Sequence, residues 1–352
     1  MRNFGVLTIS ALLLFAAATA SLGAATALLD YPPAARDNTV NHYFGTSVPA
    51  PYQWMENMQS PALHRWVDSE NALTDGYLAK IPVRPWIDKR LTELWNTPKE
   101  TAPDQVRGPR LFFRRNAGLQ NQSVLYVRDS ATAAPRMLID PNVLSPDGSI
   151  ALAGYVPSPD GRLLAYALSS GGSDWQTIHV LDVTSGKTLP DEIKWVKFSN
   201  IAWTNDDRGF FYSRYPEPAA NNAINQEVVD QKLYYHALGA SQNADRLIYS
   251  RPDLPKWILE GDVSENGRWL FVTLVNGTAT QNELYYADLQ DPQKPAIGAA
   301  LKPLFTKNDA EYAVVGVDGS TLYLRTTLDA PRRRIVAATL ADPAPAHWRQ
   351  VV

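Results

Sequence analysis

The first hydrophobic pattern along the chain is helical and lies between residues 60 and 98. Apolar residues recur there every three to four positions, which is the period of an amphipathic helix. One helix is predicted to begin after Ser60, a residue suited to capping, with Pro61 in its first turn. A second is predicted to begin at Pro85. The wide apolar face of this second helix comprises Trp86, Ile87, Leu91, Leu94 and Trp95.

These two helices need a partner surface. They could form a small subdomain with its own core, or they could dock onto another domain. Two helices alone bury too little apolar surface to be stable, which favours docking.

After residue 100 the pattern changes to short alternating strands separated by turns. One strand recurs roughly every fifty residues. A second strand recurs with the same spacing, just before the first. It starts with a turn that contains Asp or Asn and Gly, the residues that hairpin turns require. The copies of the first strand are VLYVRD (124–129), TIHVLD (177–182), KLYYHAL (232–238), ELYYADL (283–289) and RIVAATL (334–340). The copies of the second are SPDGRLLAY, NDDRGFFY, SENGRWLFV and VDGSTLYLR. Four strands per period predict β-propeller blades, and five copies are present. The predicted fold is therefore mainly β, an incomplete propeller preceded by helices.

The stretch SSGGSDW (169–175) raises the question whether Ser173 is a hydrolase nucleophile. A nucleophile elbow has the form G-x-S-x-G and leads into a helix. Here Trp175 stands where the second glycine belongs, and the strand-like QTIHVLDV follows. We therefore expect a turn inside one blade, in which Ser173 and Asp174 hydrogen-bond the local backbone.

Residues 1–24 resemble a secretory signal peptide. Arg2 is followed by an apolar stretch from Val6 to about Ala18 and by small residues suited to cleavage. An N-terminal membrane anchor is the alternative, but the apolar stretch is short for spanning a bilayer, which favours cleavage. We expect an exported, periplasmic bacterial protein without further membrane attachment.

Composition excludes several functions. The net charge is -3, and the short basic run of Arg332, Arg333 and Arg334 is typical of a solvated loop, so we expect no nucleic-acid partner. Cysteine is absent, which excludes disulfides, zinc-thiolate sites and cysteine catalysis. No two of the five histidines, at 42, 64, 179, 236 and 347, are spaced as metal ligands on one helix. No metal or other cofactor is expected.

Several long blocks resemble the prolyl oligopeptidase family. They include PYQWMEN (51–57), similar to an entry motif Asp-Pro-Tyr-x-Trp-Leu-Glu, although Ala50 replaces the aspartate. The resemblance extends from about Tyr31 to the last residue. The other blocks are NAGLQNQSVLYVRDS, LIDPNVLSPDGSIAL, SPDGRLLAYALSSGGSDWQTI, VKFSNIAWTNDDRGFFYSRYPEP and QKLYYHALG.

This resemblance implies a seven-bladed propeller joined to an α/β-hydrolase domain, which is built from an N-terminal and a C-terminal segment. Residues 25–98 would then dock on the hydrolase domain, and residues 99–352 would form about five of the seven blades. The family's catalytic Ser, Asp and His would lie beyond residue 352, so we expect this chain alone to be inactive. His179 and His236 stand where other repeats have Tyr126 or Tyr285, and we interpret them as blade residues.

The resemblance also implies a peptide site. In the family, a propeller phenylalanine in a Val-Lys-Phe-Ser block lines the interdomain cavity, and Phe198 occupies that position in VKFS. Taken without the resemblance, Phe198 would be interpreted as an ordinary core aromatic of a blade. Val228 and Ile248 match further apolar pocket residues.

The sequence is compatible with two functions. The first is the propeller portion of an exported serine endopeptidase that cleaves short peptides after proline, with the hydrolase domain as partner and the propeller restricting access. The second is a non-catalytic propeller that binds peptides or proteins. A hydrolase segment encoded downstream of Val352 would decide between them.

Overall fold

The computed structural model describes residues 29–103, 105–219 and 227–352. The predicted signal peptide at residues 1–24 lies outside the described residues. The chain separates into two compact units, one ending at Arg90 and the other beginning at Leu91. This division falls inside the second helix, and each unit is described by itself. The boundary predicted at residue 98 stays a prediction.

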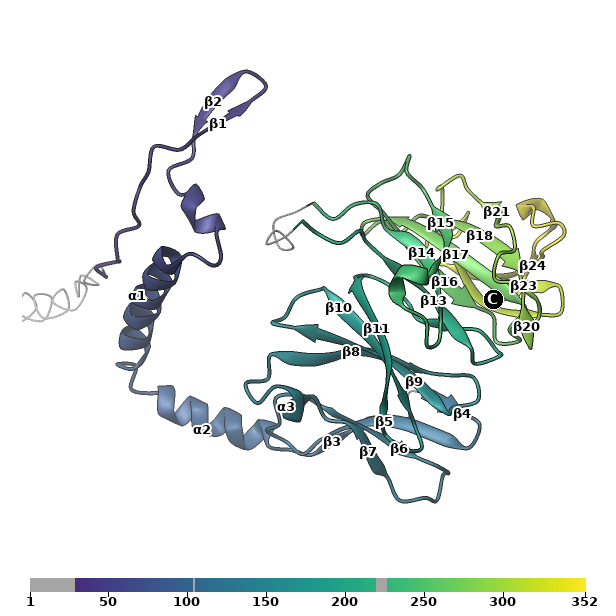
Figure 1. Cartoon of the computed structure of the whole chain (residues 1–352), viewed down its shortest axis with the longest axis horizontal. Helices are drawn as coiled ribbons and strands as arrows, with labels where there is room; N and C mark the ends of the chain where they lie inside the picture. Colours follow the sequence, from purple (N-terminus) through teal and green to yellow (C-terminus); the bar gives the residue numbers. More distant parts are fainter. Residues whose placement is uncertain (1–28, 104, 220–226) are drawn as a thin grey trace, which may run out of the picture. The chain divides into compact units, whose positions relative to one another are not determined.

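The N-terminal unit contains a hairpin, a short 3-10 helix, helix α1 and the first part of helix α2 (Figure 1). Strand β1 (Val40–Tyr43) pairs with β2 (Thr46–Pro49), and the 3-10 helix η1 (Gln53–Glu56) follows. Helix α1 (Pro61–Leu78) begins at the predicted proline, although the Ser60 side chain makes no capping hydrogen bond. Leu63 is the one buried residue of α1.

Helix α2 (Arg84–Trp95) crosses into the second unit and buries none of its residues. Trp86 is 66% exposed, and Trp95 is 61% exposed. The aromatic face expected from the sequence is therefore present and uncovered.

The second unit consists of five antiparallel blades whose strands follow one another along the chain (Figure 1). This confirms the repeat predicted from the sequence. Blade 1 contains β4 (Gln105–Arg107), β5 (Arg110–Asn116), β6 (Val124–Arg128) and β7 (Arg136–Ile139), with β3 (Lys99–Glu100) also paired to β5. The short helix α3 (Pro141–Leu144) leads to blade 2, which contains β8 (Ile150–Pro157), β9 (Leu163–Ser170), β10 (Gln176–Asp182) and β11 (Thr188–Val196).

Blades 3 to 5 repeat this arrangement. Blade 3 contains β12 (Ala202–Trp203), β13 (Gly209–Arg214), β14 (Lys232–Ala237), η2 (Gln242–Ala244) and β15 (Arg246–Ser250). Blade 4 contains β16 (Trp257–Val263), β17 (Trp269–Asn276), β18 (Asn282–Asp288) and β21 (Lys302–Phe305), with a small hairpin of β19 (Gln290–Asp291) and β20 (Lys294–Pro295). Blade 5 contains β22 (Tyr312–Asp318), β23 (Thr321–Thr326), β24 (Arg334–Thr339), η3 (Pro345–His347) and β25 (Arg349–Gln350).

The hydrophobic core lies between successive blades. Side chains alternate across each strand, so neighbouring residues enter different clusters: Phe210 packs toward blade 2, and Phe211 packs toward blade 4. Four such clusters join the five blades in sequence. A single backbone pairing, Val196 with Arg214, additionally links the sheets of blades 2 and 3.

The antiparallel order divides the loops of each blade between two ends. Connections from second to third strand, and from fourth strand to the next blade, share one end. Residues 171–175 and 197–201 therefore lie at the same end of blade 2, which we call the Phe198 end. The turns with Asp or Asn and Gly lie at the opposite end.

Candidate functional site

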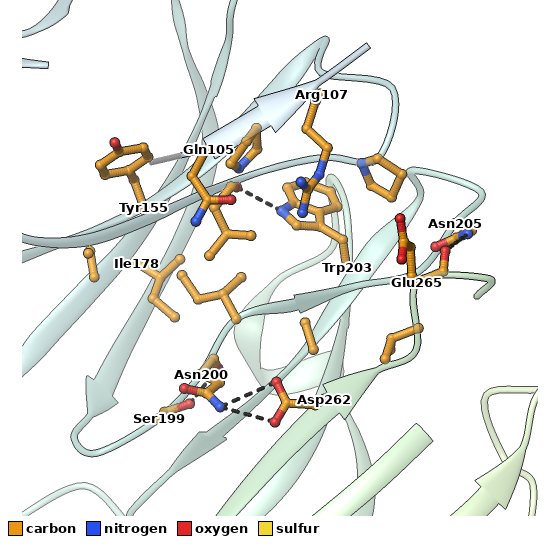
Figure 2. A pocket seen from close by; sticks show the side chains of 18 of the residues that line it. Gln105, Arg107, Tyr155, Ile178, Ser199, Asn200, Trp203, Asn205, Asp262 and Glu265 are labelled. Atoms are coloured by element: carbon orange, nitrogen blue, oxygen red, sulfur yellow. Dashed lines mark hydrogen bonds between the residues drawn. The ribbon is translucent and has the colours of Figure 1, made fainter. Parts of the chain in front are cut away.

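A cavity of about 1000 Å³ opens among the first strands of blades 1 to 4 (Figure 2). The segment after β11 reaches it through Ser199 and Asn200, and β16 reaches it through Asp262. Trp203 forms part of the wall, and its Nε1 donates a 3.0 Å hydrogen bond to the Val156 carbonyl. Further lining side chains labelled in Figure 2 are Gln105, Arg107, Tyr155, Ile178, Asn205 and Glu265.

Carboxyl groups give this cavity its electrostatic character. Asp262 is exposed to the cavity, but the cavity walls displace part of its hydration, and this partial desolvation, together with the neighbouring Glu260 charge, raises its pKa to about 6. The Asn200 amide lies 3.4 Å from both Asp262 carboxyl oxygens and lowers this pKa in part. Burial also raises the pKa of Glu260. Asp262, the β16 carboxylate that lines this cavity, therefore gains negative charge as the pH rises through the weakly acidic range.

Ser173 occupies a turn, as predicted. Its Oγ accepts a 3.1 Å hydrogen bond from the Trp175 N–H, and its own N–H donates to the Ser170 carbonyl at 3.1 Å. The two preceding glycines, Gly171 and Gly172, have φ angles of 61° and 70°, which glycine adopts without steric cost.

Asp174 is expected to hydrogen-bond the local backbone. Its carboxylate instead pairs with the Lys197 Nζ at 3.3 Å. Sequence proximity could not show this, because Lys197 reaches the turn from the next loop at the same end of the blade.

The buried histidine His236 has no nitrogen free to act as a base. Its Nδ1 lies 2.7 Å from Asp245 Oδ1, and its Nε2 lies 3.0 Å from Asp191 Oδ1. His179 lies on β10, where its ring packs on Tyr166 with centroids 5.5 Å apart. Both are blade residues, as interpreted from the repeat.

Within the described residues, a serine and a histidine lie within hydrogen-bond distance on the exposed β1–β2 hairpin, at Ser47 and His42. Ser47 Oγ lies 3.0 Å from His42 Nδ1. In the described ranges no carboxylate hydrogen-bonds to His42 to complete a triad, and a hydroxyl needs such an oriented base to become a nucleophile.

Phe198 is exposed at the Phe198 end of blade 2, between β11 and β12. Its side chain is 47% exposed, and its φ angle is 50°. Val228 is half-buried in the segment before β14. Ile248 lies on β15 and packs against the core between blades 3 and 4. None of the three lines the 1000 Å³ cavity, although Ser199 and Asn200, directly after Phe198, do so. Their predicted roles in peptide binding stay predictions.

The sequence patterns did not identify the polar residues of the cavity. A signal for Asp262 existed in WILEGDV, where it shares one face of β16 with Glu260, a residue outside this cavity. Asn200 had no comparable signal, because its partner Asp262 is 62 residues away.

Within residues 29–103, 105–219 and 227–352, none of the helices combines the length and the apolar character that spanning a bilayer requires. No group of three His, Cys, Asp or Glu side chains in the same ranges could hold a metal ion.

Comparison with known proteins gives matches along nearly the whole chain. The family model for the prolyl oligopeptidase N-terminal beta-propeller domain matches residues 32–352. A prolyl endopeptidase of Elizabethkingia miricola is 37% identical over 324 residues, covering 92% of this chain and 44% of that protein. Prolyl oligopeptidase A of Galerina marginata is 33% identical over 341 residues, covering 88% of this chain and 46% of that protein.

A solved structure is similar in fold as well. Prolyl oligopeptidase B of Galerina marginata, bound to a 35mer hydrolysis and macrocyclization substrate, has a TM-score of 0.78 and 29% sequence identity. The match covers 92% of this chain and 48% of that chain. The present chain spans about half the length of the curated relatives it matches.

Proposed function

Because this chain belongs to the prolyl oligopeptidase family, we propose that it is the N-terminal and propeller portion of a serine endopeptidase that cleaves short peptides after proline. The observation that carries the proposal is the match at 37% identity to a prolyl endopeptidase over 92% of the chain. The five blades and the uncovered apolar face of α2 support it. The hydrolase domain is the partner that this face would contact.

In this proposal the blades select substrate and the hydrolase domain supplies the chemistry. Peptide-bond cleavage by a serine enzyme requires a hydroxyl, an oriented imidazole base and donors for the oxyanion. The described residues bring no such set together, since both nitrogens of His236 are bonded to carboxylates. The propeller would restrict access, so that only short peptides reach the serine.

Phe198 is the residue with which the proposal is best tested. In the enzyme as its gene encodes it, Phe198→Ala is expected to raise KM about tenfold for peptides extended upstream of proline. The reason is that the variant loses the aromatic contact that a bound peptide would bury. KM for short substrates and the thermal unfolding midpoint should stay unchanged. Phe44→Ala is the matched control, since Phe44 is also exposed and has a φ of 49°. Equal KM values for long and short peptides in the Phe198 variant would contradict the assignment.

We also propose that residues 25–352 alone hydrolyse no prolyl substrate. A chromogenic proline peptide and a serine-directed fluorophosphonate probe would measure this directly. Turnover or labelling that disappears in Ser173→Ala would overturn both this proposal and the assignment of SSGGSDW as a turn.

Export is a separate proposal, supported by the succession of Arg2, apolar and small residues in the first 24 positions. N-terminal sequencing of periplasmic protein should find a start between about Ser21 and Leu28. Intact Met1 recovered from membranes would reject it.

The absence of a triad among the described residues also keeps a binding module as the second candidate. Under that alternative, residues 25–352 would bind a proline-containing peptide without cleaving it. Calorimetric titration of the peptide would show binding under this alternative and none under the first proposal, in which binding needs both domains.

A further inference from the structure

Phe198 has a backbone conformation that a bulky side chain rarely adopts. Its φ angle is 50°, in the left-handed region, and Trp195, three residues earlier, has a φ of 62°. Such conformations persist only where surrounding contacts determine them, and they gather at ligand-contacting sites. Contacts that impose this conformation should therefore be visible around residues 195–198.

One such contact is made by the buried side chain of Gln231. This side chain lies just before β14 and is 3% exposed. Its Nε2 donates to the Lys197 carbonyl at 2.8 Å and to the Phe198 carbonyl at 3.1 Å. Its Oε1 accepts the Leu259 N–H of β16 at 2.6 Å. The backbone that carries Phe198 is thereby fixed to blade 4.

A second contact comes from Lys197, whose ammonium lies close to two aromatic rings. Its Nζ is 5.1 Å from the Phe198 ring centroid and 5.4 Å from the Trp175 ring centroid, within the range of cation–π attraction. Asp174 Oδ2 pairs with the same Nζ at 3.3 Å. The Lys197 side chain is 16% exposed, so bulk water screens these contacts incompletely.

Trp175 is itself held in place by a buried residue. Its ring packs edge-on against Tyr215, with centroids 6.0 Å apart and an interplanar angle of 89°. Tyr215 is 5% exposed. A continuous set of contacts therefore runs from a buried blade residue through Trp175 and Lys197 to the exposed ring of Phe198.

We propose that Lys197 and Gln231 are positioning residues that hold Phe198 in one orientation before a peptide arrives. The inference rests on the proposed function, in which Phe198 contacts the peptide. A ring that is already ordered loses less conformational freedom on binding, so more of the contact energy appears as affinity. It also gives the SSGGSDW turn a role, since that turn supplies Asp174 and Trp175.

The test combines a probe of the ring with kinetics of the enzyme as its gene encodes it. A 4-fluorophenylalanine at position 198 reports ring order by 19F NMR without substrate. Lys197→Met removes the charge and keeps an apolar stem, and Lys197→Arg restores a cation. Lys187→Met is the matched control, because Lys187 is exposed in the turn after β10, at the opposite end of blade 2. Gln231→Met removes the hydrogen bonds to the two carbonyls at similar side-chain length.

We expect one sharp 19F resonance in the parent protein and in Lys187→Met. Lys197→Met and Gln231→Met should broaden or split it, and Lys197→Arg should restore it. For peptides extended upstream of proline, Lys197→Met should raise KM about three- to tenfold with kcat unchanged, the size expected from loss of a partly desolvated cation–π contact. If Gln231→Met does not fold, the Lys197 variants carry the test.

The possible failures are distinct. If Phe198→Ala leaves KM unchanged, the assignment of Phe198 to the peptide site fails, and the positioning role in peptide binding fails with it. If Phe198→Ala raises KM but Lys197→Met changes neither resonance nor KM, the proposed function stands and the positioning role is overturned. A loss in Lys197→Met that Lys197→Arg does not restore would also overturn it, because the cation would not be the active feature.

Discussion

His236 lies between two carboxylates in the interior of the blades. Its imidazole is fully buried between Asp191 of β11 and Asp245, which precedes β15, and Tyr212 donates a 2.5 Å hydrogen bond to Asp245. Burial disfavours the imidazolium, but the hydrogen bonds and charges of the two aspartates outweigh it and raise the pKa to about 9. His236 is therefore charged at neutral pH and links blade 2 to blade 3.

This arrangement predicts a specific pH dependence of stability. The folded-state pKa of about 9 lies above the unfolded value of 6.5, so the contribution is complete below pH 6.5 and is lost as the pH rises through about 9. His236→Gln should lower the free energy of unfolding by about 3–5 kcal/mol near pH 6.5, because two buried aspartates lose their cation. The difference from the parent protein should shrink toward pH 10.

Urea unfolding at several pH values between 6 and 10 would measure this. His347→Gln is the control, because His347 pairs with Asp342 at 2.7 Å but is 61% exposed, where such pairs contribute little. A constant difference between His236→Gln and the parent protein across this range would contradict the assignment of a buried imidazolium.

At the scale of an element, β13 shows how closely two paired strands of one blade approach each other. A Cβ at Gly209, its first residue, would overlap the His236 carbonyl oxygen and the Tyr235 ring of the adjacent strand β14. Gly209→Ala should therefore destabilise the protein by about 3 kcal/mol through overpacking. Gly154 in β8 is the matched control, since a Cβ there meets nothing within 4 Å.

Gly154→Ala should be neutral or stabilising by about 0.5 kcal/mol, because alanine restricts the unfolded chain. Thermal unfolding of the two variants side by side measures the contrast. Equal shifts would mean that the β13–β14 contact relaxes without cost.

The elements also show which features a sequence can reveal. Strands such as β10 and β14 were predictable, because each buries side chains on both faces and repeats at a fixed spacing. Strand β12 consists of Ala202 and Trp203 alone, too short to show a period of two. The conformation of Phe198 depends on Gln231, 33 residues away. Local patterns carry no information about such contacts between loops.

At the scale of the whole molecule, the two units differ in how much they bury. Helices α1 and α2 together bury one residue, Leu63, whereas four core clusters join the blades. In the 352-residue chain, trypsin should therefore cut first after Lys80 or Lys89, because helices with few buried contacts open easily.

Mass spectrometry of a limited digest would identify these sites and a resistant fragment containing the blades. The segment 220–226 contains no lysine or arginine, so trypsin cannot cut there. Earlier cleavage after Lys187 or Arg162 would show instead that the blades open before the helices.

The uncovered aromatic face of α2 has a consequence for the synthesis of the protein. A ribosome makes this helix before every blade, and roughly 260 residues follow it. At a translation rate of about 5–20 residues per second, Trp86 and Trp95 are synthesised roughly 13–50 s before the last blade is complete. Each blade can close as it emerges, because its strands are neighbours in the chain, but α2 cannot. We expect a ribosome-associated chaperone to bind the nascent chain at this helix, and photo-crosslinking from position 86 on stalled ribosomes would reveal its presence or absence.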